Sequence, residues 1–249
     1  MPVASRYPKR RTPAPSPADI LVHFHRWGFC LVPSVPSGEC DDEGARAVMK
    51  KVQSDPQNAV GFADNNLPPG APDSSIHTGR FAKWTATVPT RFPSVKEAAR
   101  RLRAAVYGLP DGKRLFGDMC ALSLLATEVD ADEQPVHIDG VLKEGCPVEP
   151  SCFAVVPLMR QGSALWVWPG GQKAVFGHSV GVDVIQPLKV VVGYNQVLLM
   201  RRYLPHAGCT YSTPNLRLCA NFGLPTGDVG DEVTVLLGDH LTPFQALSP

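Results

Sequence analysis

Apolar residues recur at helical spacing near the start of this chain of 249 residues. Ser16 is a typical N-cap residue, and Pro17 suits the first position of a helix. Ile20 and Phe24 belong to one apolar stripe, and Gly28 follows that stripe where a helix commonly ends. The pattern therefore predicts a first helix that begins after Ser16 and ends at Gly28.

Two further helices are predicted before residue 110. One lies near 39–52, and the other begins with the capping box of Ser94 to Glu97 and runs to about Val106. In both, apolar side chains return every three or four residues and would form one buried face: Ala45, Val48, Met49 and Val52 in the first, and Ala98, Leu102, Ala105 and Val106 in the second. We expect these helices to pack against the outside of a sheet.

After residue 118 the pattern changes to short β-type runs that are separated by turn residues. A similar run lies earlier, at 28–33, directly after the first predicted helix. The later runs cover 119–129, 152–158, 164–168, 188–192, 197–200 and 216–222. Many short strands at close spacing are typical of a β-sandwich or a β-barrel. The sequence therefore predicts a mainly β fold with flanking helices.

Composition narrows the class of protein. A hydrophobic share of 44% supports one sizeable core, and a net charge of +1 gives no overall field that would attract nucleic acid. The seven cysteines are an odd number without C-x-x-C spacing, which argues against a disulfide framework and against a structural zinc site. No apolar run has the length of a membrane span, and no secretory signal is visible. We expect an intracellular protein, either cytoplasmic or nuclear.

The basic N-terminal segment is expected to stand apart from the fold. Residues 1–17 contain no acidic residue, five prolines and the cluster Lys9-Arg10-Arg11, so a disordered tail is predicted. A nuclear-import or nucleic-acid-contacting arm and an organelle transit peptide are alternatives. The rest, 18–249, is predicted to be a single domain with helical support and an active-site loop at 18–118, a β core at 119–224 and an extension at 225–249.

The most informative residues are a His-x-Asp pair and a later histidine. His137 and Asp139 alternate with Ile138, so both would point to one face of a strand and could reach one ion. His206 follows the apolar run 197–200, where a strand edge is expected. Two imidazoles and a carboxylate on one side of a metal leave the opposite positions open, an arrangement that non-haem Fe(II) oxygenases use. A single His-x-Asp, by contrast, is common by chance.

Arg217 lies in the last β-type run, where a buried guanidinium would need an anionic partner such as a dicarboxylate. With His137, Asp139 and His206, it resembles the Fe(II)/2-oxoglutarate-dependent dioxygenases, in particular the phytanoyl-CoA dioxygenase-like branch. The resemblance covers about 119–224, with an echo at 28–33. It implies a double-stranded β-helix, or jelly roll, that uses Fe(II), 2-oxoglutarate and O2 to hydroxylate a C–H bond.

By this resemblance, His137, Asp139 and His206 would bind iron, and Arg217 would bind the distal carboxylate of 2-oxoglutarate. Many members of the family carry Ser or Thr two residues after the arginine, whereas this chain has Cys219. The departure weakens the expectation of a hydroxyl contact to the cosubstrate. It leaves the expected salt bridge unaffected.

The segment 61–93 is rich in Gly, Pro, Asn and Asp, so it is predicted to be a long irregular loop. In the resembling family, the segment before the core strands commonly covers the mouth of the active site. The candidates for substrate contact are therefore polar or aromatic residues of this loop: Asn65, Asn66, Arg80, Lys83 and Trp84. An ordinary solvated loop is the alternative for any one of them.

Three functions follow from these residues. The first is oxidation of a C–H bond in a small metabolite or a protein side chain, with 2-oxoglutarate as a small-molecule cosubstrate. The second is the same chemistry on a modified nucleobase in DNA or RNA, with phosphates bound by basic residues such as Arg11, Arg80 and Lys83. The third is a non-catalytic, cupin-like jelly-roll binding module.

Overall fold

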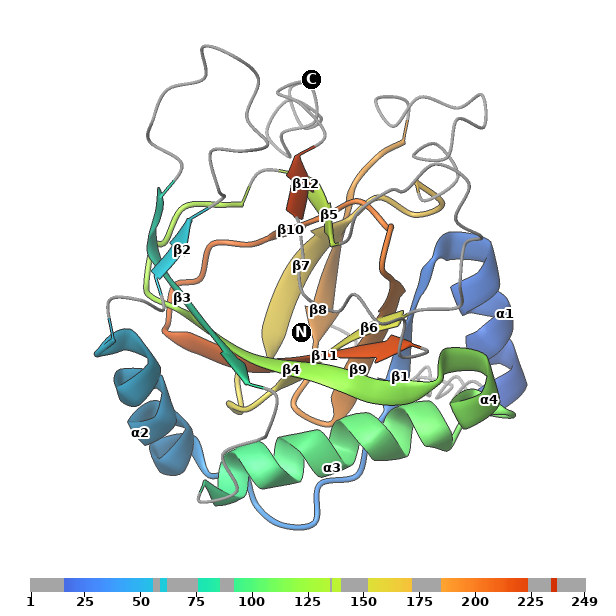
Figure 1. Cartoon of the computed structure of the whole chain (residues 1–249), viewed down its shortest axis with the longest axis horizontal. Helices are drawn as coiled ribbons and strands as arrows, with labels where there is room; N and C mark the ends of the chain where they lie inside the picture. Colours follow the sequence, from blue (N-terminus) through green and yellow to red (C-terminus); the bar gives the residue numbers. More distant parts are fainter. Residues whose placement is uncertain are drawn as a thin grey trace, which may run out of the picture.

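Two antiparallel sheets face each other, and helices cover the outer surface of the larger one (Figure 1). The computed structural model describes residues 16–55, 59–61, 76–85, 92–134, 136–139, 152–171, 185–223 and 234–236. Within these ranges, no helix is both long and apolar enough to cross a lipid bilayer. The predicted tail, except for its last two residues, and nearly all of the predicted C-terminal extension lie outside the described residues.

The larger sheet has seven strands, and every described pairing in it is antiparallel. In spatial order the strands are β1 (Phe29–Pro33), β9 (Gln196–Arg201), β6 (Cys152–Pro157), β11 (Asn215–Gly223), β4 (Asp118–Thr127), β3 (Ile76–Thr85) and β2 (Ala59–Gly61). The β-type runs of the sequence analysis that fall in this sheet are confirmed to within about two residues.

The smaller sheet has five strands and is also antiparallel in its described pairings. Its order is β12 (Thr234–Leu236), β5 (His137–Asp139), β10 (His206–Gly208), β7 (Ser163–Val167) and β8 (Leu188–Val192). The short strands β5 and β10 carry the predicted metal ligands. They lie next to each other although they are far apart in the sequence.

Four helices belong to the described structure: α1 (Pro17–Trp27), α2 (Asp42–Gln53), α3 (Pro93–Tyr107) and α4 (Gly112–Phe116). The predicted start of α1 is confirmed, because the Ser16 hydroxyl accepts from the backbone N–H of Asp19, and Gly28 ends the helix with φ of 85°. All eight residues predicted to form the buried faces of α2 and α3 are buried.

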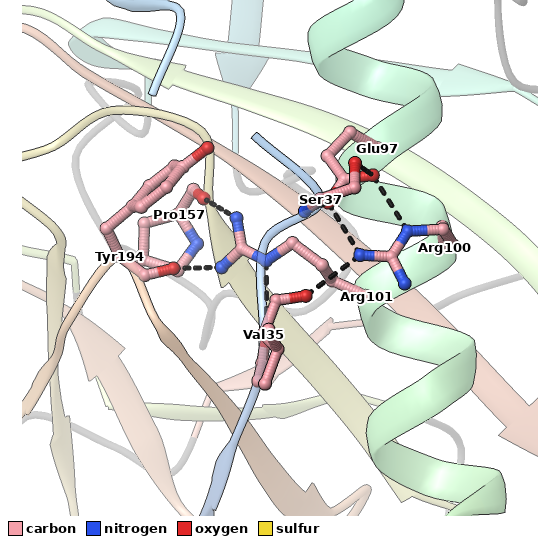
Figure 2. A network of polar contacts seen from close by, with 8 residues as sticks. Val35, Ser37, Glu97, Arg100, Arg101, Pro157 and Tyr194 are labelled. Carbon is pink, nitrogen blue, oxygen red and sulfur yellow. Dashed lines mark hydrogen bonds and ion pairs between the residues drawn. The ribbon is translucent and has the colours of Figure 1, made fainter. Parts of the chain in front are cut away.

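The predicted capping box of α3 is wrong. Pro93 takes the first helical position, and Phe92 becomes the N-cap without a side-chain cap bond. The Glu97 carboxylate instead accepts from Arg100 and from the backbone N–H and hydroxyl of Ser37 (Figure 2). These bonds lower the pKa of Glu97 to about 2. The Glu97 carboxylate, which the local pattern assigned to the start of the helix, therefore binds a residue distant in the sequence, Ser37, as well as Arg100.

Alternation along β11 creates two cores. Leu216 and Leu218 pack with the helices, whereas Cys219 packs between the sheets with Leu165 and Val167 of β7. Arg217 shares the inner face with Cys219 because residues two apart on a strand point the same way. A polar guanidinium is thus held in the space between the two sheets.

The expectation of an irregular loop over 61–93 is wrong for 76–85. These residues form β3, which pairs with β4 over six register positions from Arg80 with Thr127 to Thr85 with Leu122. Strand preference depends on the available neighbours, so pairing with β4 outweighs a weak local pattern. The strand carries Arg80 into the interior.

Candidate metal and cosubstrate site

His137 and His206 lie directly opposite each other in the pair formed by β5 and β10. Their ring centroids are 4.4 Å apart, and both side chains are buried. Opposed residues of an antiparallel pair project from the same face of the sheet. Asp139 lies two positions along β5 from His137. The backbone thus presents the three predicted ligand positions to one space.

The ring of His206 is held in a defined orientation. Its Nδ1 lies 2.9 Å from the carbonyl oxygen of Leu204, and the ring of Phe153 stacks against it at 6.3 Å. Because a carbonyl oxygen can only accept, Nδ1 is the donor in this contact, and in the neutral ring the lone pair then lies on Nε2. A metal-binding histidine commonly has this tautomer, fixed by a hydrogen bond from its other nitrogen.

The donor set suits a divalent transition metal. Imidazole nitrogens favour Zn, Cu, Fe and Ni, and a carboxylate completes a facial set of three. Among the described side chains, no three His, Cys, Asp or Glu residues form a possible metal site. A site at the two histidines therefore needs a third ligand, and Asp139 occupies the strand position from which one would come.

Arg217 provides a buried cation between the sheets. Its side chain is 2% exposed, and its Nη1 donates to the hydroxyl of Tyr211 at 2.8 Å. Within the described part of the chain, its Nε has no hydrogen-bond partner. A buried guanidinium with an unused donor is costly unless an acceptor reaches it. The group therefore fits the carboxylate end of a bound ligand.

Tyr211 holds Arg217 in place and was missed in the sequence analysis. Its hydroxyl donates to the carbonyl oxygen of Ala164 at 2.6 Å, accepts from the backbone N–H of Ala164 at 3.1 Å and lies 3.0 Å from the Ser163 hydroxyl. The residue lies in a loop between β10 and β11, where no periodic pattern indicates burial. Only the packing of that loop onto β7 reveals its role.

Arg80 adds a second buried guanidinium close to Arg217. Burial, followed by the positive charge of Arg217, lowers the pKa of Arg80 to about 10, so it remains protonated at neutral pH. No described carboxylate forms an ion pair or a hydrogen bond with either arginine. The interior around these two arginines is therefore electropositive, which favours an anionic ligand.

Known proteins match this chain in structure, whereas no protein-family profile and no curated protein match its sequence. The epimerase SnoN from nogalamycin biosynthesis, described as non-haem and α-ketoglutarate-dependent, superposes with a TM-score of 0.56 at 14% identity, over 90% of this chain and 96% of SnoN. A second SnoN structure holds Fe3+, α-ketoglutarate and nogalamycin RO.

Two other structures give similar values. AviO1 from Streptomyces viridochromogenes Tue57 has a TM-score of 0.56 at 16% identity, over 86% of this chain and 98% of AviO1. A prolyl hydroxylase from Trichoplax adhaerens, in complex with a peptide fragment of hypoxia inducible factor, has a TM-score of 0.53 at 14% identity, over 82% and 87%. The chain shares the fold of the 2-oxoglutarate-dependent oxygenases.

Within this oxygenase fold, the predicted substrate contacts fall in different places. Asn65 and Asn66 lie outside the described residues. Lys83 and Trp84 lie in β3, opposite Leu124 and Ser123 of β4. Their contact with a substrate stays a prediction.

Arg80 has internal partners. Its side chain is fully buried, and its guanidinium donates to backbone carbonyl oxygens of the protein. Substrate contact by Arg80 stays a prediction too. The bonds that the structure shows join its guanidinium to Asp132, which precedes β5, and to Cys209, which follows β10. Cys219, the position at which the sequence departs from the resembling family, is buried and hydrogen-bonds Arg217.

Proposed function

We propose that this protein is an Fe(II)/2-oxoglutarate-dependent dioxygenase that oxidises a C–H bond of a small metabolite or a protein side chain. His137, Asp139 and His206 would hold the iron, and Arg217 would bind the distal carboxylate of 2-oxoglutarate. The observation that carries the proposal is the combination of an opposed histidine pair with a buried arginine whose Nε donor is unused. We further propose that the two facing sheets form a double-stranded β-helix of the phytanoyl-CoA dioxygenase-like branch.

The residues of this chain have distinct tasks in that reaction. When bound, Fe(II) together with 2-oxoglutarate supplies the activation of O2 and the oxidising power. Arg217, held by Tyr211, orients the cosubstrate through its far carboxylate. The carbonyl of Leu204 fixes the His206 ring. Apolar side chains between the sheets, including Phe153 and Leu165, exclude water from the interior.

Two observations bear on the substrate. The structural neighbours include a SnoN complex with nogalamycin RO and a prolyl hydroxylase complex with a peptide, so both small molecules and peptides are bound by proteins of this fold. Arg80, one of the cations invoked for phosphate binding, is fully buried. A nucleobase substrate is therefore the weaker hypothesis, and a cupin-like module without catalysis is tested by the experiment below.

The test is an anaerobic titration of the metal-free protein with Fe(II) and 2-oxoglutarate, followed by the visible charge-transfer band of the chelated complex. The band should appear in the wild type and be abolished in His206→Ala. It should require about 10- to 100-fold more 2-oxoglutarate in Arg217→Ala, because a hydrogen-bonded charge pair is worth about 1.5–3 kcal/mol. Arg160→Ala is the matched control, since the side chain of Arg160 is 70% exposed.

Each outcome separates two functions. Iron binding without a band in the wild type would favour the non-catalytic module. A wild type that fails to bind iron would overturn the ligand assignment. Unfolding curves of every variant distinguish a lost ligand from a lost fold. A band that is equally strong in His206→Ala would remove His206 from the site.

A further inference from the structure

Arg80 makes an unusual set of hydrogen bonds for a strand residue. Its Nε and Nη2 donate to the carbonyl oxygen of Asp132 at 3.0 and 2.6 Å. Nη2 also donates to the carbonyl oxygens of Cys209 at 2.9 Å and Gly208 at 3.4 Å, and Nη1 donates to the Thr127 hydroxyl at 3.4 Å. One buried guanidinium therefore connects three segments of the chain, two of them through their backbone carbonyls.

Two of these segments carry the predicted metal ligands. Asp132 lies on the approach to β5, which begins at His137, whereas Gly208 is the last residue of β10, which begins at His206. Among the described residues, the pairing between β5 and β10 has one register position, His206 opposite His137. A single pair of residues specifies the register of two strands only weakly. The bonds made by Arg80 supply a further attachment between the two segments.

Other bonds run between the same two segments. The backbone N–H of Gln134 donates to the carbonyl oxygen of Gly208 at 3.0 Å, and the N–H of Gly208 donates to the side-chain oxygen of Gln134 at 2.9 Å. The N–H of Asp130 donates to the carbonyl oxygen of Tyr211 at 3.0 Å. Arg80 lies within this series of contacts. The segments before His137 and after His206 are thus tied together along their length.

The space around Arg80 is filled. A Cβ added at Gly208 would come within 2.3 Å of the Gln134 side-chain oxygen and 2.9 Å of the Arg80 Nη1. The planar, rigid fork of a guanidinium can bond several carbonyls at fixed angles, whereas an ammonium group is a flexible point charge. Arginine at position 80 therefore sets the separation of the two segments.

We propose that Arg80 is a positioning residue that holds the strands of His137 and His206 at the separation needed to bind one metal ion. The inference rests on the proposed function. It assigns Arg80 no contact with the metal, the cosubstrate or the substrate. Groups that orient metal ligands typically change metal affinity by about 10- to 100-fold when they are removed.

The test compares the same substitution at two buried arginines. Arg101 of α3 is 2% exposed; its Nε donates to the Ser34 hydroxyl, and its other nitrogens donate to the carbonyl oxygens of Pro157 and Tyr194 (Figure 2). It lies on the helix-covered side of the larger sheet. Arg80→Lys and Arg101→Lys should both lower Tm, because each loses bonds to buried carbonyls.

Metal affinity is then measured by anaerobic calorimetry with Fe(II) alone, and with Ni(II) alone as a redox-stable probe, below the lower Tm. Arg80→Lys should bind about 10- to 100-fold more weakly than the wild type, and Arg101→Lys should bind like the wild type. Equal affinity in Arg80→Lys and the wild type would overturn the inference while the proposed function stands. A wild type that binds neither metal would overturn both.

A second variant covers the case in which Arg80→Lys does not fold. Gly208→Ala leaves both the arginine and the histidines in the chain, but its added methyl group would clash with the side chains of Gln134 and Arg80. Its metal affinity should fall in the same direction, while Gly170→Ala, where an added Cβ meets nothing within 4 Å, should keep the affinity of the wild type. Equal affinity in Gly208→Ala and Gly170→Ala would contradict the positioning role.

Discussion

Replacing Tyr211 by Phe removes one oxygen atom and leaves the ring in place. That oxygen accepts a hydrogen bond from Arg217 at 2.8 Å and donates one to the Ala164 carbonyl at 2.6 Å. In the variant, the Nη1 of Arg217 loses its acceptor, the Tyr211 hydroxyl. The Nε of Arg217 has no hydrogen-bond partner within the described residues even in the wild type. The loop that carries Tyr211 also loses its polar attachment to β7. We therefore expect Tyr211→Phe to destabilise the folded protein.

The magnitude follows from the two bonds. A hydrogen bond to a charged group contributes about 1.5–3 kcal/mol, and a neutral one contributes about 0.5–1.5 kcal/mol. Their loss should lower the free energy of unfolding by about 2–4.5 kcal/mol. For a chain of this length, each kcal/mol corresponds to about 2–4 °C, so Tm should fall by about 4–18 °C. Both bonds are partly buried, so salt should screen them less than it screens an exposed pair.

The assay is urea unfolding of the metal-free protein followed by fluorescence, with Tyr107→Phe as the control. Tyr107 packs its ring edge-to-face against Phe222 at 6.0 Å, and its hydroxyl makes no hydrogen bond within the described residues. The control should therefore stay within about 0.5 kcal/mol of the wild type. If Tyr211→Phe were equally neutral, the hydroxyl would contribute no net stability, and Tyr211 could not be what holds Arg217.

Two other predictions concern the scaffold. Bonds from Arg100 and Ser37 depress the pKa of Glu97 from 4.5 to about 2, so their stabilisation is full above pH 4.5 and is lost as the pH falls toward 2. The stability difference between wild type and Glu97→Gln should therefore shrink between pH 7 and pH 3 in unfolding curves; a constant difference would contradict the ion pair. Gly162 and Gly170 have φ of 79° and 81°, but an added Cβ would lie 2.4 Å from the Val192 carbonyl oxygen only at Gly162. Gly170→Ala should cost about 1–2 kcal/mol from the backbone alone, and Gly162→Ala clearly more; equal Tm losses would refute the contact.

The sequence predicted well wherever local periodicity and burial agree. Ala45 and Val48 of α2, and Leu102 of α3, recur at helical spacing because one face of each helix meets the sheet. The prediction failed where a residue distant in the sequence determines the local conformation or the hydrogen-bond partner. Residues 76–85 read as a loop, yet β4 makes them a strand. Glu97 fitted a capping box, yet Ser37, far away in the chain, takes part of its carboxylate.

The candidate site divides in the same way. His137, Asp139 and Arg217 were identified from residue type and strand alternation, because the chemistry of a ligand is a property of the side chain. Tyr211 and the internal partners of Arg80 were not foreseen. Both residues act through backbone carbonyl groups of other segments, and every residue has such a carbonyl. No sequence pattern marks which carbonyl a side chain will reach.

The sequence by itself determined the alternation that sends Arg217 and Cys219 to one face of a strand and Leu216 and Leu218 to the other. This follows from backbone geometry, which fixes a period of two in any strand. Only the tertiary structure decided that His206 lies opposite His137 and that Arg80 connects the two segments. Register between distant strands depends on the packing of whole sheets, and that packing is a sum over many weak contacts that no local window contains.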